Sequence, residues 1–186
     1  MNYKLNKIDP IQLIEKYYPK DSDIHYILLI HSEQIKNKAL MIANRMTNLH
    51  LDTEFIAEAA MLHDIGIFMC NAPRIHCQGE NPYIKHGYLG ADLLREEGLP
   101  RHALVCERHT GVGISLQTIL KNDLPLPHRD MLPISLEEKL ICYADKFYSK
   151  TQLTEEHTVE RIRKSLQHFG EAEVAKFDEW HNLFGE

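Results

Sequence analysis

The chain has 186 residues and a formal net charge of −6, with 44% hydrophobic and 26% charged residues. This length suits one domain with a sizeable core, and the composition is that of a soluble globular protein. Acidic and basic residues are interspersed, so the chain lacks the basic face of a nucleic-acid binder. No apolar run approaches the roughly 20 residues of a membrane helix, and the first residues lack the apolar core of a secretory signal. We therefore expect a cytoplasmic protein without a nucleic-acid polymer or a membrane as partner.

Helical signals follow one another along the chain, and no segment carries a convincing strand pattern. The patterns predict helices at residues 11–18, 24–46, 54–64, 86–98, 101–109, 115–122, 135–150, 158–169 and 171–184. In the helix over 24–46 the apolar residues recur every three or four positions, and His31 lies on that buried face. Asp52 can cap the next helix, which Gly66 is expected to end. The fold class is therefore all-α.

The segments after residue 66 add a long loop and further helices. Residues 66–85 contain two prolines and Gly79, and a loop of this length is often a lid or a binding loop. The Gly90–Ala91 step in the following helix would allow a neighbour to approach closely. Ser135 and Glu138 have the spacing of a capping box at the start of the helix over 135–150. The two C-terminal helices, within 157–184, are amphipathic and offer either intrachain packing or a homodimer surface; we favour intrachain packing.

The stretch "AAMLHDIGIF" at 59–68 places an imidazole and a carboxylate in apolar surroundings. Burying such a pair is costly unless a metal ion or hydrogen bonds satisfy it. Further candidates fall on inward helix faces or at helix ends beside loops, which gives the set His31, His63, Asp64, His86, His109 and Asp145. Imidazole nitrogen and carboxylate oxygen suit Zn, Fe, Mn or Co ions, and bundle cores often hold such sites. Taken alone, a histidine on an apolar helix face is more often a hydrogen-bonded core residue than a metal ligand.

The cysteines do not join this set. Their spacing shows no CxxC pair, which agrees with reduced thiols: Cys70, Cys77, Cys106 and Cys142. A zinc site made of Cys70, His76 and Cys77 lacks the spacing of any standard module. Cys106 lies one helical turn from His109, where a buried thiol is commoner than a ligand. The remaining histidines, at 25, 50, 102, 128, 157, 168 and 181, are predicted to be surface or capping residues.

The order of these residues resembles the HD-domain superfamily of metal-dependent phosphohydrolases. "HDIG" at 63–66 is the signature of one branch, and "HSEQIKNKALMIA", "KHGYLGADLLREEG", "ERHTG" and "EEKLICYADK" follow the family order over residues 25–150. The resemblance implies a helical bundle with a metal centre in its core, forming a single domain over 1–186 with its core at about 22–150. It also implies one metal held by His31, His63, Asp64 and Asp145. In members with two metals, His86 and His109 would hold the second and Asp64 would bridge.

The resemblance implies a function, and the sequence differs from the family pattern at one position. We expect hydrolysis of a phosphate ester or anhydride of a small nucleotide by metal-activated water, with one or two divalent ions (Fe, Mn, Mg, Zn, Ni or Co). Catalysis would use His63, Asp64, His86 and His109. Many HDIG proteins carry a basic residue after the glycine, whereas this chain has Ile67 there. The candidate replacements for phosphate binding are Arg74, Lys85, Arg108 and Lys146. The alternative is a sensor that retains metal and nucleotide without substantial turnover.

Overall fold

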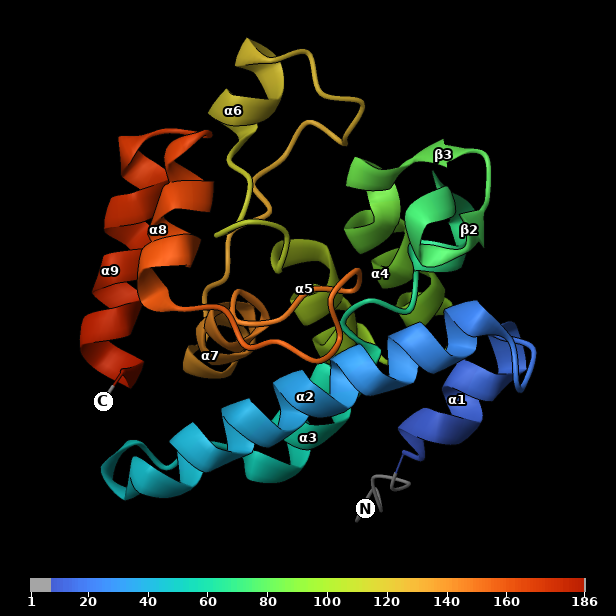
Figure 1. The fold of residues 1–186 in the computed structure, drawn as a ribbon, viewed down its shortest axis with the longest axis horizontal. Coiled ribbons are helices and arrows are strands. Elements are labelled where there is room, and N and C mark those ends of the chain that lie inside the picture. The colour runs from blue at the N-terminus through green and yellow to red at the C-terminus, as the bar shows by residue number, and fades with distance from the viewer. Residues whose placement is uncertain (1–7, 186) are drawn as a thin grey trace, which may run out of the picture.

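The computed structural model describes residues 8–185, which form a helical bundle with a small sheet at one side (Figure 1). The α-helices are α1 (Pro10–Tyr17), α2 (Asp23–Arg45), α3 (Thr53–Leu62), α4 (His86–Glu96), α5 (Pro100–Arg108), α6 (Leu116–Lys121), α7 (Leu136–Asp145), α8 (Val159–Gln167) and α9 (Glu171–Phe184). The all-α prediction is confirmed. None of the described helices is both long and apolar enough to cross a membrane.

Local sequence signals account for most helix starts. The Ser22 side chain accepts a hydrogen bond from the His25 amide at the start of α2, and the Asp52 side chain caps α3 through the Phe55 amide. Ser135 and Glu138 form the predicted capping box on α7. Each of these contacts satisfies a backbone amide that the first helical turn leaves without a partner.

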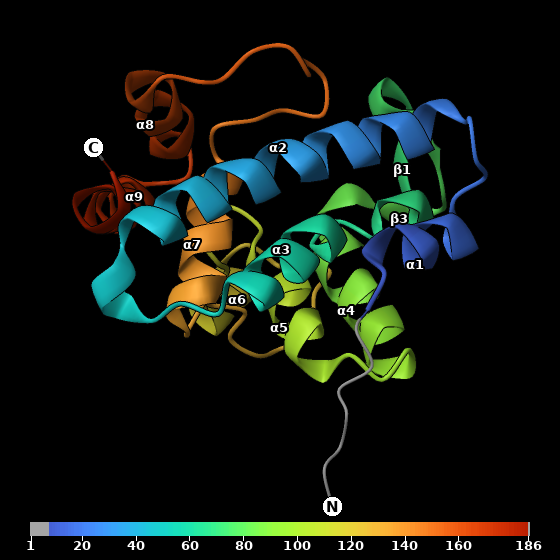
Figure 2. The same ribbon diagram turned by 90° about the horizontal axis from the view of Figure 1, so that it is seen from below.

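The apolar faces pack into two large clusters that meet along α2, α3 and α5. One cluster joins the C-terminal half of α2 to α3, α7, α8 and α9, and the other joins α1 and the N-terminal half of α2 to α4 and α5. Figure 2 shows α2 as a long rod lying over α3 and α7. The predicted intrachain packing of the last helix is confirmed, because α9 contacts α7 and buries Phe177, Trp180 and Phe184 completely or nearly so.

The loop over 66–85 contains three short strands that no pattern in the sequence predicted. They are β1 (Cys70–Ala72), β2 (Cys77–Gln78) and β3 (Asn81–Pro82), in the sheet order β2-β1-β3. β1 pairs antiparallel with β2, with Ala72 opposite Cys77, and parallel with β3, with Cys70 opposite Asn81. Strands of two or three residues are too short to show an alternating pattern in a sequence.

The predicted role of Gly66 as a helix end is wrong. α3 ends at Leu62, and the φ of Gly66 is an ordinary −85°. A Cβ on Gly66 would lie 2.3 Å from the His86 carbonyl oxygen and 2.5 Å from the Gly90 nitrogen. Gly66 is therefore needed because α4 passes against it, and the predicted close approach at Gly90 is confirmed. This contact fixes the start of α4 beside the end of α3.

Two of the histidines predicted to lie at the surface are buried, with His25 9% and His102 7% exposed. The ring of His102 packs edge-on against Phe55, with 5.0 Å between centroids, and its Nε2 lies 3.2 Å from Glu58 Oε2. A hydrogen-bonding partner inside the α3–α5 contact thus accommodates a residue type that is usually exposed.

Candidate metal centre

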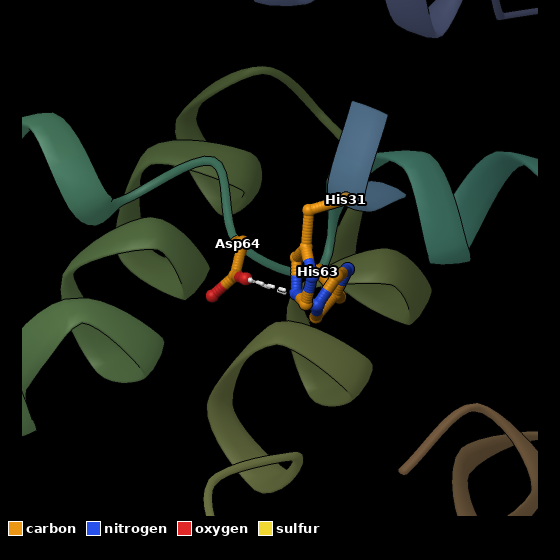
Figure 3. A group of neighbouring side chains, drawn as sticks. All are labelled: His31, His63 and Asp64. Atoms are coloured by element: carbon orange, nitrogen blue, oxygen red, sulfur yellow. Dashed lines mark ion pairs between the residues drawn. The ribbon is translucent and has the colours of Figure 1, made fainter. Parts of the chain in front are cut away.

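The six predicted ligands come together between the two core clusters. His31 lies on α2, His63 and Asp64 follow α3, and His86 begins α4. His109 follows α5 and Asp145 ends α7, so five helices contribute. All six residues are at most 9% exposed. Figure 3 shows the imidazoles of His31 and His63 together beside the Asp64 carboxylate.

The Asp64 carboxylate lies at the middle of this cluster, with a different pair of histidines facing each oxygen. Oδ2 lies 3.2 Å from His31 Nε2 and 3.1 Å from His63 Nε2. Oδ1 lies 3.3 Å from both His86 Nε2 and His109 Nε2. Asp145 joins the first pair, because its Oδ1 lies 3.2 Å from His31 Nε2 and 3.6 Å from His63 Nε2. The cluster is thus divided into two halves that share one carboxylate.

Three of the histidines are oriented by the ends of helical segments. The Nδ1 atoms of His63, His86 and His109 each lie 2.7 Å from the carbonyl oxygen three residues earlier, those of Ala60, Tyr83 and Cys106. Carbonyls in the last turn of a helix lack an intrahelical partner, so a following histidine can donate to them. A carbonyl can only accept, and Nδ1 therefore carries the proton in each ring. Three acidic side chains of the helices that contribute ligands pair with other residues: Glu58 with His102, Glu33 with Lys36 and Glu107 with Arg95.

This protonation pattern calls for a cation at the centre of the cluster. Once Nδ1 holds the proton, a neutral imidazole presents a lone pair at Nε2, and His86 Nε2 and His109 Nε2 lie only 3.1 Å apart. Burial lowers the pKa of His86 to about 3 and also lowers the pKa of His109, so both rings are neutral. His63 Nε2 and Asp64 Oδ1 are buried without a hydrogen bond. The residues thus fit a divalent metal ion bound by imidazole nitrogen and carboxylate oxygen.

The carboxylates of the cluster are held in their charged form. Burial alone would raise the pKa of Asp64, but Lys150 and His63 outweigh burial and hold this pKa well below its usual range. Burial would likewise raise the pKa of Asp145, but Lys146 outweighs burial and holds this pKa well below its usual range. Lys146 Nζ lies 2.8 Å from Asp145 Oδ2. For His63, burial favours the neutral ring, but the nearby Asp64 and Asp145 carboxylates outweigh burial and raise the pKa of His63 to about 9. Without a metal, His63 therefore holds a proton that a bound ion would displace.

Lys150 is a residue of the candidate site that the sequence analysis did not predict. Its Nζ lies 2.5 Å from Asp64 Oδ2, and its side chain is 14% exposed. The predicted helix over 135–150 would have carried Lys150 onward along the helix axis, but α7 ends at Asp145 and the chain turns back. Lys150 also lies 6.0 Å from the centroid of the Tyr83 ring, which itself stacks on His86. The only sequence signal was the basic pair "DKFYSK" just after the last ligand.

A cavity of about 600 Å³ opens beside the cluster, and Asp145, Lys146 and Lys150 lie in its wall. Of the four predicted phosphate-binding cations, Arg74 and Lys146 line this cavity. Lys85 and Arg108 lie outside the lining, and Arg108 donates to Glu138 Oε2 at 2.8 Å. The four cysteines are buried free thiols.

Comparison with known proteins decides the family. The HD-domain family model matches residues 28–150, which include all six ligand positions. The chain belongs to the HD-domain family. The "uncharacterized protein MJ0778" of Methanocaldococcus jannaschii is 36% identical over 137 residues, 73% of this HD-domain chain and 72% of that protein.

Other relatives carry a matching region within a longer chain. The tRNA (cytidine(56)-2'-O)-methyltransferase of Thermoplasma volcanium is 32% identical over 156 residues, 83% of this HD-domain chain. The match spans only 40% of that enzyme, and 35% of the Picrophilus torridus enzyme of the same name, which is 29% identical.

Solved structures share the HD fold at low sequence identity. The HD domain of the L. monocytogenes phosphodiesterase PgpH matches with a TM-score of 0.52 and 15% identity, covering 91% of this chain and 93% of that one. The same domain in complex with cyclic-di-AMP matches with a TM-score of 0.54 and 15% identity, covering 94% of each chain. At this identity the likeness shows the fold alone.

Proposed function

We propose that this HD domain is a phosphohydrolase that cleaves a phosphate ester or anhydride of a small nucleotide, using water activated by one or two divalent metal ions. The observation that carries the proposal is the cluster itself, in which ionised carboxylates and imidazole lone pairs converge next to a cavity with cationic walls. Family membership supports a hydrolase in general, and a PgpH HD domain bound to cyclic-di-AMP supports a nucleotide as substrate.

We assign His31, His63, Asp64 and Asp145 to a first ion. His86 and His109, with Asp64 as the bridging carboxylate, would hold a second, because a separate Asp64 oxygen faces each group. Such an ion would lower the pKa of a bound water and offset the charge of phosphoryl oxygens. Hydrolysis then forms a bond from the water oxygen to phosphorus and breaks the bond to the leaving oxygen, which takes up a proton.

The protein's own side chains position and neutralise the substrate in this proposal. Lys150 and Lys146 lie in the cavity wall next to the ligands, where an ammonium group can bind a non-bridging phosphoryl oxygen. Lys150 thereby supplies the cation that the HDIG branch carries after the glycine and that Ile67 does not. The carbonyl bonds at Nδ1 hold three of the imidazoles in the orientation that leaves Nε2 free.

A direct test loads the purified full chain with Mn²⁺ or Fe²⁺ and screens nucleotides, dinucleoside polyphosphates and p-nitrophenyl phosphate. We expect phosphate release that is lost in His63→Ala and Asp64→Ala, together with bound metal in the wild type. Nucleotide binding without turnover in the metal-replete protein would overturn the enzyme and favour the sensor. Failure of the wild-type chain to bind any divalent metal would overturn both.

A further inference from the structure

The cavity beside the metal centre extends well beyond the ligands. One wall comes from the small sheet and its connections, with Arg74, and another from α8 and the turn that follows it, with Arg161 and Phe169. A volume of about 600 Å³ is within the usual range of small-molecule sites. A single phosphate held at the ligands would leave the outer part of this cavity without an occupant.

Most of the outer wall lies beyond the part of the chain that matches the HD family. The match ends at residue 150, whereas Arg161 and Phe169 belong to the segment that follows. The connection from α7 to α8 is anchored on α2, since Gln34 Nε2 donates to the Leu153 carbonyl and Lys38 pairs with Glu156 (Figure 2, orange). The cavity therefore has an outer wall that is fixed on α2 and that comes largely from residues after the end of the family-model match.

The charge of the cavity is opposite to that of the chain. Arg74, Lys146, Lys150 and Arg161 line it, whereas Asp145 is the only carboxylate among its lining residues. The chain as a whole carries −6. Lys146 and Lys150 contact ligand carboxylates. The outer cations are Arg74 and Arg161, and Arg161 also pairs with Glu155, which does not line the cavity. A concentration of positive charge in a cavity attracts anionic groups.

The present partners of Arg161 are weak enough for a bound phosphate to replace them. Its guanidinium donates to Gln152 Oε1 at 2.6 Å and to Glu155 Oε2 at 3.3 Å, and its side chain is 50% exposed. An exposed pair of this kind contributes little to stability. A phosphate offers the planar guanidinium a stronger, two-point contact.

Phe169 completes the outer end of the cavity with an exposed aromatic ring. It is 77% exposed, whereas Phe55, Phe147, Phe177 and Phe184 are all at most 5% exposed. An aromatic face at the mouth of a positively charged cavity can stack on a nucleobase, a contact worth about 1–3 kcal/mol in proteins that bind nucleic acids.

We propose that the outer half of the cavity binds the part of the substrate beyond the scissile phosphate. Arg74 and Arg161 bind a second phosphate group, and Phe169 stacks on the base. This inference rests on the proposed function, because it takes the ligand cluster as the place of cleavage. The protein is therefore selective for nucleotides that carry two phosphate groups, joined as an anhydride or as a second ester, over simple monoesters.

The kinetic test compares kcat/KM of the metal-loaded full chain for ADP, for the dinucleotide pApA and for p-nitrophenyl phosphate. Arg161→Gln and Arg74→Gln are each expected to lower kcat/KM for ADP or pApA by about 10-fold and to change that for p-nitrophenyl phosphate less than 2-fold. Phe169→Ala lowers the nucleotide values in the same selective way. Arg163→Gln is the matched control, because Arg163 lies on α8, pairs with Asp178 and does not line the cavity. An equal loss for all three substrates, or none, overturns the inference.

A binding measurement separates this inference from the proposed function. The Kd of non-hydrolysable α,β-methylene-ADP is measured calorimetrically with the wild type, Arg161→Gln and Arg163→Gln, after thermal melts confirm that each is folded. Weakening of about 10-fold in Arg161→Gln alone supports the subsite even if no phosphate ester is hydrolysed, in which case only the proposed function fails. Equal affinities in all three proteins overturn the subsite even if hydrolysis is observed.

Discussion

Lys150→Met tests whether the ammonium group of Lys150 binds the reacting phosphoryl group, as the proposed function requires. The substitution keeps most of the side-chain length but removes the ammonium group that lies 2.5 Å from Asp64 Oδ2. A hydrogen bond to a charged group contributes about 1.5–3 kcal/mol, and each 1.36 kcal/mol is tenfold in rate. If Lys150 binds the reacting phosphoryl group, kcat/KM should therefore fall about 10- to 150-fold. Metal content should not fall, because Lys150 no longer competes with the ion for Asp64 and the histidine ligands are unchanged.

The assay combines steady-state kinetics with metal analysis of the same preparations. Lys150→Arg should recover part of the activity, since it restores the positive charge. Lys121→Met, an exposed substitution on α6, should leave both quantities unchanged. Loss of the metal from Lys150→Met would refute the reasoning, because it would make Lys150 a support of the ligands. Wild-type kinetics in that variant would refute it as well.

Three further predictions concern the ligands and their supports. Asp64→Asn should weaken metal binding by roughly 100-fold or more, as measured by metal titration, because loss of a ligand should cost more than the roughly 10- to 100-fold typical of a residue that only hydrogen-bonds to a ligand. Because the pKa of His63 is raised to about 9 in the metal-free protein, metal affinity should rise with pH and level off near 9. Calorimetry in buffers of different ionisation enthalpy should show about one proton released at pH 7.5; a pH-independent affinity would contradict this. Gly66→Ala should cost about 1–3 kcal/mol in urea unfolding and reduce metal binding, since its Cβ would displace the backbone at His86.

The ligand set could be predicted because local patterns place it. His31 shares the apolar face of a long helix, and the adjacent His63 and Asp64 interrupt an apolar run, so periodicity alone points them inward. His86, His109 and Asp145 are predicted from their places on inward helix faces or at helix ends beside loops. The family order agrees with the whole set, and the structure brings all six together. Predicted capping at Asp52 and Ser135 is confirmed for the same reason, because a cap depends on residues only three positions apart.

The surroundings of the ligands could not be predicted, because they depend on contacts between distant segments. Lys150 reaches Asp64 only because α7 stops at Asp145, and no strong helix-breaking residue marks that stop. The carbonyl partners of the imidazoles are backbone atoms, and a backbone partner cannot be read from residue types. Arg161 enters the cavity wall through a long connection whose path a local pattern does not specify.

The burial of Ile67 explains why the positive charge beside Asp64 comes from Lys150, which lies beyond the end of α7. Ile67 is 0% exposed and belongs to the apolar cluster that includes Ile65, Cys77 and Leu94. An ammonium group at position 67 would be desolvated in that cluster, and the carboxylate it would need is already in contact with Lys150. In this chain the position therefore serves the core, and the site draws its cation from elsewhere.

Ile67→Lys should accordingly destabilise the protein by several kcal/mol in urea unfolding, whereas Ile67→Leu should cost less than about 1.5 kcal/mol. The informative variant is Ile67→Lys combined with Lys150→Met, which we expect to remain as inactive as Lys150→Met alone. Recovery of kcat/KM in the double variant, with wild-type stability, would contradict this reasoning. It would show that a lysine at position 67 can reach the phosphoryl group, so that the two positions are interchangeable in this fold.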